Sequence, residues 1–186
     1  MEGAGEPNLN ENADLEPKAW QDQLFDTIKR AGISQVGYVP DAGHARLIER
    51  CKADPGIRDV VLTTEEEGVA LAAGAWLGGA RAALLMQSSG AGNCINMLSL
   101  MRTCRFPMLM FITMRGEWEE FNPWQEPMGS IVEPVMKLCD ADVYRAHEAG
   151  EVKGIAERAV QQAYGDERIV AVLLSQQLIG KKVWTK

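Results

Sequence analysis

The sequence predicts a doubly wound α/β fold, with a six-stranded, mostly parallel sheet covered by helices on both faces. Short apolar runs alternate regularly along the chain with stretches whose apolar residues recur at helical spacing. The run at 107–114 is apolar throughout, which is typical of a strand buried on both faces. Neighbouring parallel strands need crossover connections, and helices between the strands supply them. In such sheets ligands bind at the carboxyl ends of the strands.

The expected elements follow one another from Trp20. Apolar residues between Trp20 and Ala31 recur at helical spacing, and Gly32 ends this first helix. Further helices are expected at 43–53, 65–77, 92–101, 131–139 and 151–164. Strands are expected at 35–39, 59–63, 80–87, 107–114, 142–145 and 169–174. Residues 1–17 are rich in Glu, Asn, Gly and Pro, and we expect a disordered acidic and polar tail there, followed by a single domain at 18–186.

The composition argues against several classes of protein. Of the 186 residues, 46% are hydrophobic and 24% are charged, and the net charge is -7, which disfavours a surface for nucleic acid or for an anionic membrane. No apolar run approaches the ~20 residues of a membrane span. The four cysteines lack metal-ligand spacing, and residues 1–17 do not resemble a secretory signal. We therefore expect a cytoplasmic protein with reduced thiols.

The segment TTEEEGVALAAGAWLGG (63–79) opens the helix that follows the second expected strand. Thr64 is placed as an N-cap, and Glu67 would complete a capping box. Three glutamates in a first turn suit the helix dipole, so the residues alone favour a structural role for them. Ala70, Ala73 and Gly74 share one helical face and would let this helix approach another backbone closely.

The segment MQSSGAGN (86–93) is a weak match to a phosphate-binding glycine loop. A dinucleotide fingerprint would need a glycine where Ile95 stands and would follow the first strand. The sequence has no G-K-[ST] motif, so a P-loop is not predicted. The alternative reading is a glycine-rich turn that opens a helix.

The segment RGEWEEFNPWQEPMG (115–129) is expected to be an irregular loop. Loops of this length often form lids or binding surfaces. Trp118, Phe121 and Trp124 carry much apolar surface, whereas the flanking glutamates should prevent full burial within this domain. We expect the loop to meet a partner subunit or to cover a site.

Taken together, four segments carry a resemblance to a known family: GYVPDA (37–42), TTEEEGVALAAGAWLGG, LLMQSSGAGN and RGEWEEFNPWQEPMG. In this order they resemble the pyrimidine-binding domain of thiamine-diphosphate-dependent decarboxylases. The likeness is greatest to the alpha subunits of sulfopyruvate decarboxylases, and next to phosphonopyruvate decarboxylases. It spans about residues 20–180.

The resemblance implies roles for individual residues. The family's glutamate, nine residues before a glycine, matches Glu65 when counted back from Gly74. That glutamate hydrogen-bonds N1′ of the cofactor's aminopyrimidine and thereby promotes loss of the C2 proton of the thiazolium. Gln87 matches a polar active-site position near the substrate, so Glu65 and Gln87 are the catalytic candidates. The cofactor-binding candidates are Asp41, Glu65, Gly90 and Asn93. The substrate-binding candidates are His44, Ser88, Ser89, Arg115, Asn122 and Gln125.

The resemblance also implies a partner. The family's second domain carries G-D-G followed by an Asn, which holds Mg²⁺ and the diphosphate, and the nearest segment here, Gly165-Asp166-Glu167, has no such Asn after it. We expect thiamine diphosphate as cofactor, with Mg²⁺ held by a beta subunit that carries this motif. Self-association of the pyrimidine-binding domains is also expected.

The expected function is that of an alpha subunit of a two-subunit 2-oxo acid decarboxylase. A sulfonate or phosphonate substrate would need a cation, for which Arg115, Arg102 and Arg105 are the candidates near strand ends. Two alternatives are open: a carboligating subunit and a non-catalytic or regulatory domain of the same fold. A nucleotide-binding flavodoxin-like protein is disfavoured, because the phosphate-binding fingerprints are missing.

Overall fold

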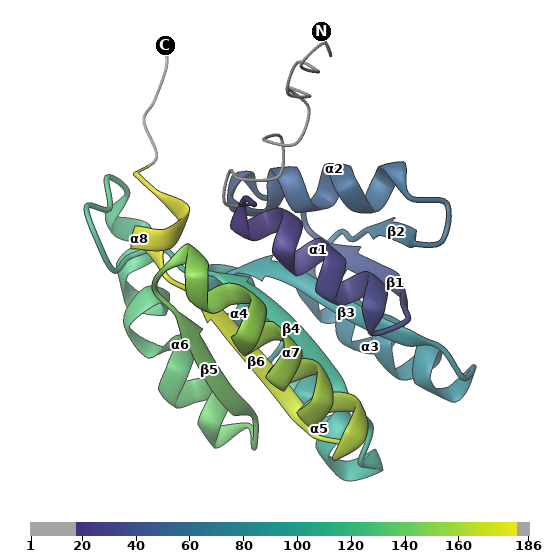
Figure 1. Ribbon diagram of the computed structural model, residues 1–186. Helices are drawn as coiled ribbons and strands as arrows, with labels where there is room; N and C mark the ends of the chain where they lie inside the picture. Colours follow the sequence, from purple (N-terminus) through teal and green to yellow (C-terminus); the bar gives the residue numbers. More distant parts are fainter. Residues whose placement is uncertain (1–17, 182–186) are drawn as a thin grey trace, which may run out of the picture.

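The computed structural model describes residues 18–181, which contain one six-stranded sheet. The strands are β1 (Ile33–Tyr38), β2 (Arg58–Val61), β3 (Arg81–Gln87), β4 (Met108–Thr113), β5 (Asp142–Ala146) and β6 (Ile169–Leu174). They lie in the order β2-β1-β3-β4-β6-β5, and every pairing is parallel (Figure 1). The predicted doubly wound α/β class is confirmed. The predicted tail at 1–17 lies outside the described residues.

Helices cover both faces of this sheet (Figure 1). The helices α1 (Trp20–Arg30), α2 (Ala45–Ala53) and α7 (Ala149–Gly165) pack on one face. The other face is covered by α3 (Glu65–Leu77), α4 (Ser88–Asn93), α5 (Ile95–Cys104) and α6 (Glu126–Leu138). Short helical turns complete the connections: η1 (Ala42–His44), η2 (Pro123–Gln125) and α8 (Gln176–Ile179). None of the helices within 18–181 is long and apolar enough to cross a membrane.

The central strands show why an apolar run without alternation forms this sheet. All six residues of β4 are buried, because helices cover it from both sides. Successive side chains of a strand point to opposite faces. Leu109 and Phe111 therefore pack under α1, α2 and α7, whereas Met108, Met110 and Ile112 pack under α3, α5 and α6.

Two expected connections are more helical than the sequence suggests. A glycine-rich turn is expected after β3, but α4 begins at Ser88, directly at the strand's end. The expected irregular loop at 115–129 is partly helical, because α6 begins at Glu126 and not near 131. Pro123 and Pro127 lie at the first positions of η2 and α6, where proline is preorganised for a helix.

The capping box predicted at the start of α3 does not form. Thr64 is the N-cap residue, but its side chain makes no capping bond. The carboxylate of Glu67 instead accepts a hydrogen bond at 2.8 Å from the backbone N–H of Thr63, one residue earlier. Of the small residues expected to let α3 approach another backbone, Ala73 is buried in the core, whereas Ala70 and Gly74 are exposed, and nothing lies within 4 Å of a Cβ added at Gly74.

Candidate active site

Polar residues gather at the carboxyl edge of the sheet, where the strand order reverses. β1 and β3 are neighbours in the sheet. The chain leaves β1 toward the face covered by α2, but it leaves β3 toward the opposite face, which is covered by α4. A crevice opens above the strands at such points. A cavity of about 160 Å³ lies there, and its lining includes Asp41, Gly43, Thr113, Arg115, Gln176 and Lys181. The cavity thus draws on the ends of β1, β4 and β6.

Glu65 occupies the first position of α3 and is the glutamate of its first turn that is sheltered from solvent. Its exposed fraction is 8%, whereas Glu66 and Glu67 are exposed. Its Oε2 accepts a hydrogen bond at 2.9 Å from Nδ2 of Asn93 in α4. A Cβ added at Gly90 would lie 2.3 Å from the Glu65 Oε1, so only a glycine leaves room for this carboxylate. The structure therefore brings together three of the predicted cofactor-binding residues.

Around the start of α4, the other predicted residues differ in their accessibility. Gln87 is half-buried at the end of β3 and lies beside Thr113 in the strand register. Ser88 is fully buried, and its Oγ accepts a hydrogen bond at 3.2 Å from the backbone N–H of Arg115. Ser88 thus joins the ends of β3 and β4. Ser89 is half-buried.

His44 is predicted to bind substrate, but its imidazole is completely buried. Burial lowers the pKa of His44 below its usual range, although the charge of Asp41 opposes this. The ring is therefore neutral near pH 7, and its Nε2 contacts the Phe111 carbonyl at 3.1 Å. Because a carbonyl only accepts, Nε2 carries the proton, and Nδ1 is a buried acceptor with no donor among the described residues. In this structure His44 anchors the turn after β1 and does not line the cavity.

Arg115 is committed to a buried ion pair. Its guanidinium donates to both carboxylate oxygens of Glu120, at 2.8 and 2.5 Å, and the two side chains are 11% and 3% exposed. Burial raises the pKa of Glu120, but hydrogen bonds from Arg115 and from the amides of Asn122, Gly116 and Gln176 outweigh it and lower the pKa to about 2. The glutamates of this loop are expected to prevent its full burial within the domain, but the Glu120 side chain is itself buried.

The cations expected to bind a sulfonate or phosphonate are not free at this edge. Arg115 is paired with Glu120, and Lys181 lies 2.6 Å from Glu119. Arg102 and Arg105 line a separate cavity beside Ile169, the first residue of β6, and so lie at the amino edge of the sheet. Their predicted place near the site is wrong, because the end of a helix that follows a strand returns to the opposite edge.

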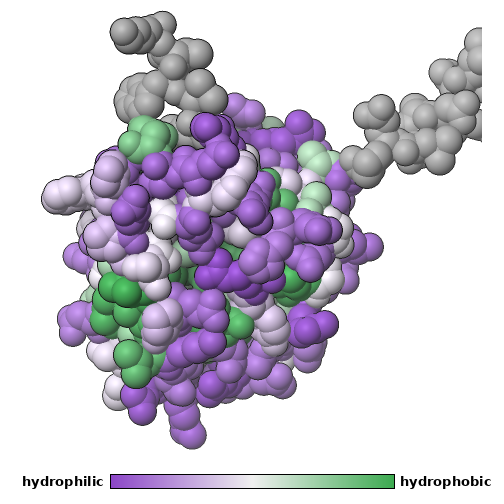
Figure 2. Space-filling model, turned by 90° about the vertical axis from the view of Figure 1, so that its left-hand side faces the viewer, coloured by the Kyte–Doolittle hydropathy of each residue, from purple (hydrophilic) through white to green (hydrophobic). Residues whose placement is uncertain are grey.

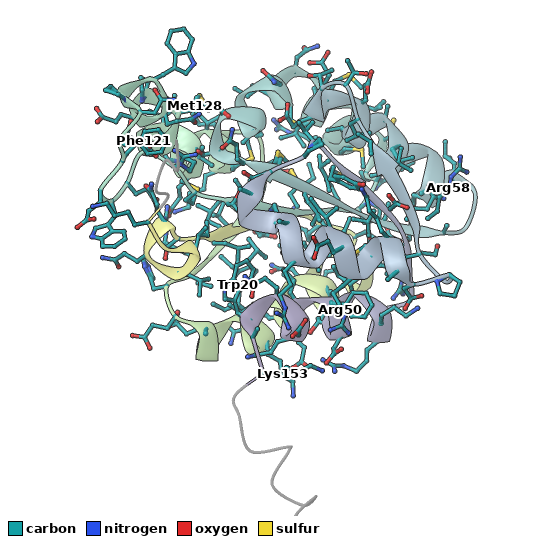
Figure 3. All side chains as sticks on the ribbon, turned by 90° about the horizontal axis from the view of Figure 1, so that it is seen from above. Trp20, Arg50, Arg58, Phe121, Met128 and Lys153 are labelled. Atoms are coloured by element: carbon teal, nitrogen blue, oxygen red, sulfur yellow. The ribbon has the colours of Figure 1, made fainter. Side chains whose placement is uncertain are left out.

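The two substrate-binding candidates of the loop, Asn122 and Gln125, lie at the two ends of η2. The Asn122 side chain caps η2 by accepting a hydrogen bond from the Trp124 N–H at 3.2 Å. The Gln125 Oε1 is buried without a hydrogen-bond donor among residues 18–181. Phe121 lies beneath the Arg115 guanidinium, 5.4 Å from ring centre to Cζ, and in Figure 3 Phe121 and Met128 are on the same side of the molecule, opposite Arg58.

Large apolar side chains are exposed along this loop and α6. Trp124 is 84% exposed, Phe121 41% and Trp118 36%, and α6 adds Ile131 and Leu138. Figure 2 shows the side of the molecule on which α6 and β5 lie, where separate hydrophobic clusters interrupt a mostly hydrophilic surface. Such apolar surface is typical of a protein–protein interface.

Comparison with known proteins gives the family. The family described as thiamine pyrophosphate enzyme, N-terminal TPP binding domain, matches residues 19–129. The chain belongs to this family. It is 33% identical over 151 residues to the sulfopyruvate decarboxylase subunit alpha of Methanocaldococcus jannaschii, covering 81% of this chain and 89% of that one. It is 39% identical over 113 residues to the phosphonopyruvate decarboxylase of Streptomyces viridochromogenes, but covers 28% of that protein.

A solved structure shares the fold at low sequence identity. The 2-oxoglutarate:ferredoxin oxidoreductase of Magnetococcus marinus matches 87% of this chain and 29% of its own, with a TM-score of 0.67 and 12% identity. This solved structure shows the fold alone. The resemblance to thiamine-diphosphate decarboxylases inferred from the sequence segments is confirmed by the family match and by the sulfopyruvate and phosphonopyruvate decarboxylase relatives.

Two residues of this thiamine pyrophosphate domain were missed in the sequence. Thr113 is the last residue of β4 and Gln176 lies two residues after the end of β6; both are buried polar residues that line the cavity. Gln176 accepts hydrogen bonds from the N–H groups of Glu117 and Trp118, at 2.9 and 3.0 Å, and donates to Glu120 at 2.9 Å. The signal was present, since a polar residue at the end of an apolar strand points to the ligand-binding edge.

Proposed function

We propose that this chain is the subunit of a thiamine-diphosphate-dependent 2-oxo acid decarboxylase that holds and activates the cofactor's aminopyrimidine. Glu65 carries the proposal. A carboxyl group that exchanges a proton with a ring nitrogen must be fixed, sheltered from water and open on one side. Glu65 is 8% exposed, Asn93 holds one of its oxygens, and no donor within 18–181 holds the other.

The residues around Glu65 fit the pyrimidine half of the cofactor. Gly90 presents bare backbone beside the carboxylate, so a flat ring can approach without meeting a side chain. The bound cofactor supplies the thiazolium carbon that attacks a 2-oxo acid and takes up the electrons released with CO₂. Glu65 would hold or release the proton at the ring nitrogen, and Asn93 would keep its carboxylate in place.

We further propose that a second polypeptide holds the diphosphate and Mg²⁺, and that this subunit also associates with its own kind. The proposal is supported by the relative from Methanocaldococcus jannaschii, which is named as an alpha subunit and of which this chain covers 89%. The exposed rings of Trp118, Phe121 and Trp124 offer a surface for the second polypeptide.

Glu65→Gln tests the assignment of the glutamate. With the partner and cofactor present, we expect this variant to lose at least about 100-fold in kcat, because an amide cannot exchange the proton. Glu66→Gln is the matched control, since Glu66 lies in the same turn and is exposed. Glu67→Gln should also retain activity, because its amide oxygen can still accept from Thr63. Similar small effects from all three variants would contradict the assignment.

Cofactor binding tests the divided site. Calorimetry should detect no binding of thiamine diphosphate by this chain at micromolar concentrations, with or without Mg²⁺, and should detect binding once the partner is added. Tight Mg²⁺-dependent binding to the chain alone would contradict the proposal that the diphosphate is held elsewhere.

A further inference from the structure

Thr113 makes a contact that the proposed chemistry does not yet use. It is the last residue of β4 and is 1% exposed. Its Oγ1 lies 2.6 Å from Oδ2 of Asp41, which follows β1. A carboxylate can only accept, so the threonine hydroxyl donates this bond. The second acceptor near Oγ1 is the Met86 carbonyl at 3.3 Å, which is the longer contact.

The turn that carries Asp41 is also held against β4 by His44 and packs closely on this strand at Gly43. The Nε2–H of the buried His44 donates to the Phe111 carbonyl and holds the end of the turn. At Gly43 an added Cβ would lie 2.8 Å from Cγ2 of Thr113 and 2.9 Å from Oδ2 of Asp41. Position 43 thus has no room for a side chain while Asp41 and Thr113 are in contact. The backbone of the turn and the side chain of Asp41 are held by the same strand.

This arrangement leaves one Asp41 oxygen free. Oδ2 accepts from Thr113, whereas Oδ1 has no hydrogen-bond donor within residues 18–181. Asp41 lines the cavity at the carboxyl edge together with Thr113, Arg115 and Gln176. A carboxylate fixed through one oxygen and open at the other is suited to contact a substrate in one defined orientation.

We propose that Thr113 is a positioning residue, which orients the Asp41 carboxylate toward substrate bound in this cavity. The inference rests on the proposed decarboxylase function and adds a residue to it. Asp41 would touch the substrate, and Thr113 would act through Asp41. Its hydroxyl, and not its methyl group, carries this role.

Two substitutions separate the hydroxyl from the methyl group. Thr113→Val keeps the shape and removes the hydrogen bond, and Thr113→Ser keeps the hydroxyl and removes the methyl group. With the partner and cofactor present, we expect Val to lower kcat roughly 10- to 100-fold, with little change in KM, because a hydrogen bond to a charged group is lost. Serine should restore most of that rate. If Thr113 only fills space, the order reverses, with Val active and Ser impaired, and the proposal is overturned.

A double-mutant cycle and a structural readout complete the test. In an Asp41→Asn background, Thr113→Val should lower kcat much less than it does in the wild type. Fully additive effects of the two substitutions on the activation free energy would overturn the proposal. Crystal structures of the wild type and the Val variant should differ in the orientation of the Asp41 side chain, and an unchanged side chain would also count against it. A wild-type complex that decarboxylates no 2-oxo acid would contradict the proposed function, and the crystallographic comparison would still decide what Thr113 does.

Discussion

Glu120→Gln removes one charge of a buried ion pair and is expected to lower the stability of the fold. The Glu120 side chain is 3% exposed and receives both arms of the Arg115 guanidinium. It also accepts hydrogen bonds from the N–H groups of Gly116 and Asn122, at 3.1 and 3.0 Å. Glutamine keeps the size and one acceptor oxygen but leaves the buried guanidinium of Arg115 without a counterion.

The magnitude follows from the pKa of this carboxyl. The pKa of this carboxyl is about 2 in the folded chain and about 4.3 in the unfolded chain. This difference contributes roughly 3 kcal/mol to the free energy of unfolding at neutral pH. Breaking a buried ion pair by removing one partner costs a similar amount, about 3 to 5 kcal/mol. Because the folded-state pKa is the lower one, this contribution is complete above pH ~4.3 and is lost as the pH falls from there toward 2.

Urea unfolding followed by circular dichroism measures this contribution. At pH 7 we expect Glu120→Gln to lower the midpoint by about 1.5 M, taking a slope of roughly 2 kcal/mol per M. Glu119→Gln is the matched control, because its ion pair with Lys181 is exposed and should contribute less than about 1 kcal/mol. The difference between wild type and Glu120→Gln should shrink as the pH falls below ~4.3. Equal midpoints for the two variants at pH 7 would refute the reasoning.

Two other predictions concern the site and its surface. Gly90→Ala would place a Cβ 2.3 Å from the Glu65 carboxylate, so we expect the chain to fold and kcat to fall at least ~10-fold. Gly154→Ala, with nothing within 4 Å, is the control for activity, and equal activities would contradict the placement of Glu65. Trp124→Ala should leave the stability of the chain within ~0.5 kcal/mol but weaken binding of the partner by about 2 kcal/mol in calorimetry. Leu138→Ala, equally exposed at the far end of α6, should not weaken it, and an unchanged affinity for Trp124→Ala would show that the loop is not an interface.

Local patterns determine most of the fold, and they could be read in the sequence. The apolar runs of β4 and β6 and the helical spacing of α1 are properties of neighbouring residues, and the structure has these elements within a few residues of their expected bounds. Connections were less predictable. The start of α6 at Glu126 lies in a segment rich in Trp, Pro and Glu, whose helical turns depend on caps and packing and not on periodicity.

The sequence alone also placed Glu65 at the start of a helix beyond a strand and Gly90 and Asn93 beyond the next strand. Their contact joins residues 28 positions apart, and it forms because α3 packs against β3 and α4. Only the tertiary structure could decide the longer pairings. Asp41 and Thr113 are 72 positions apart, and Glu120 and Gln176 are 56 apart. These pairs meet because the strand order brings the ends of β1, β4 and β6 to one edge, and that order arises from packing among distant segments, which no local pattern encodes.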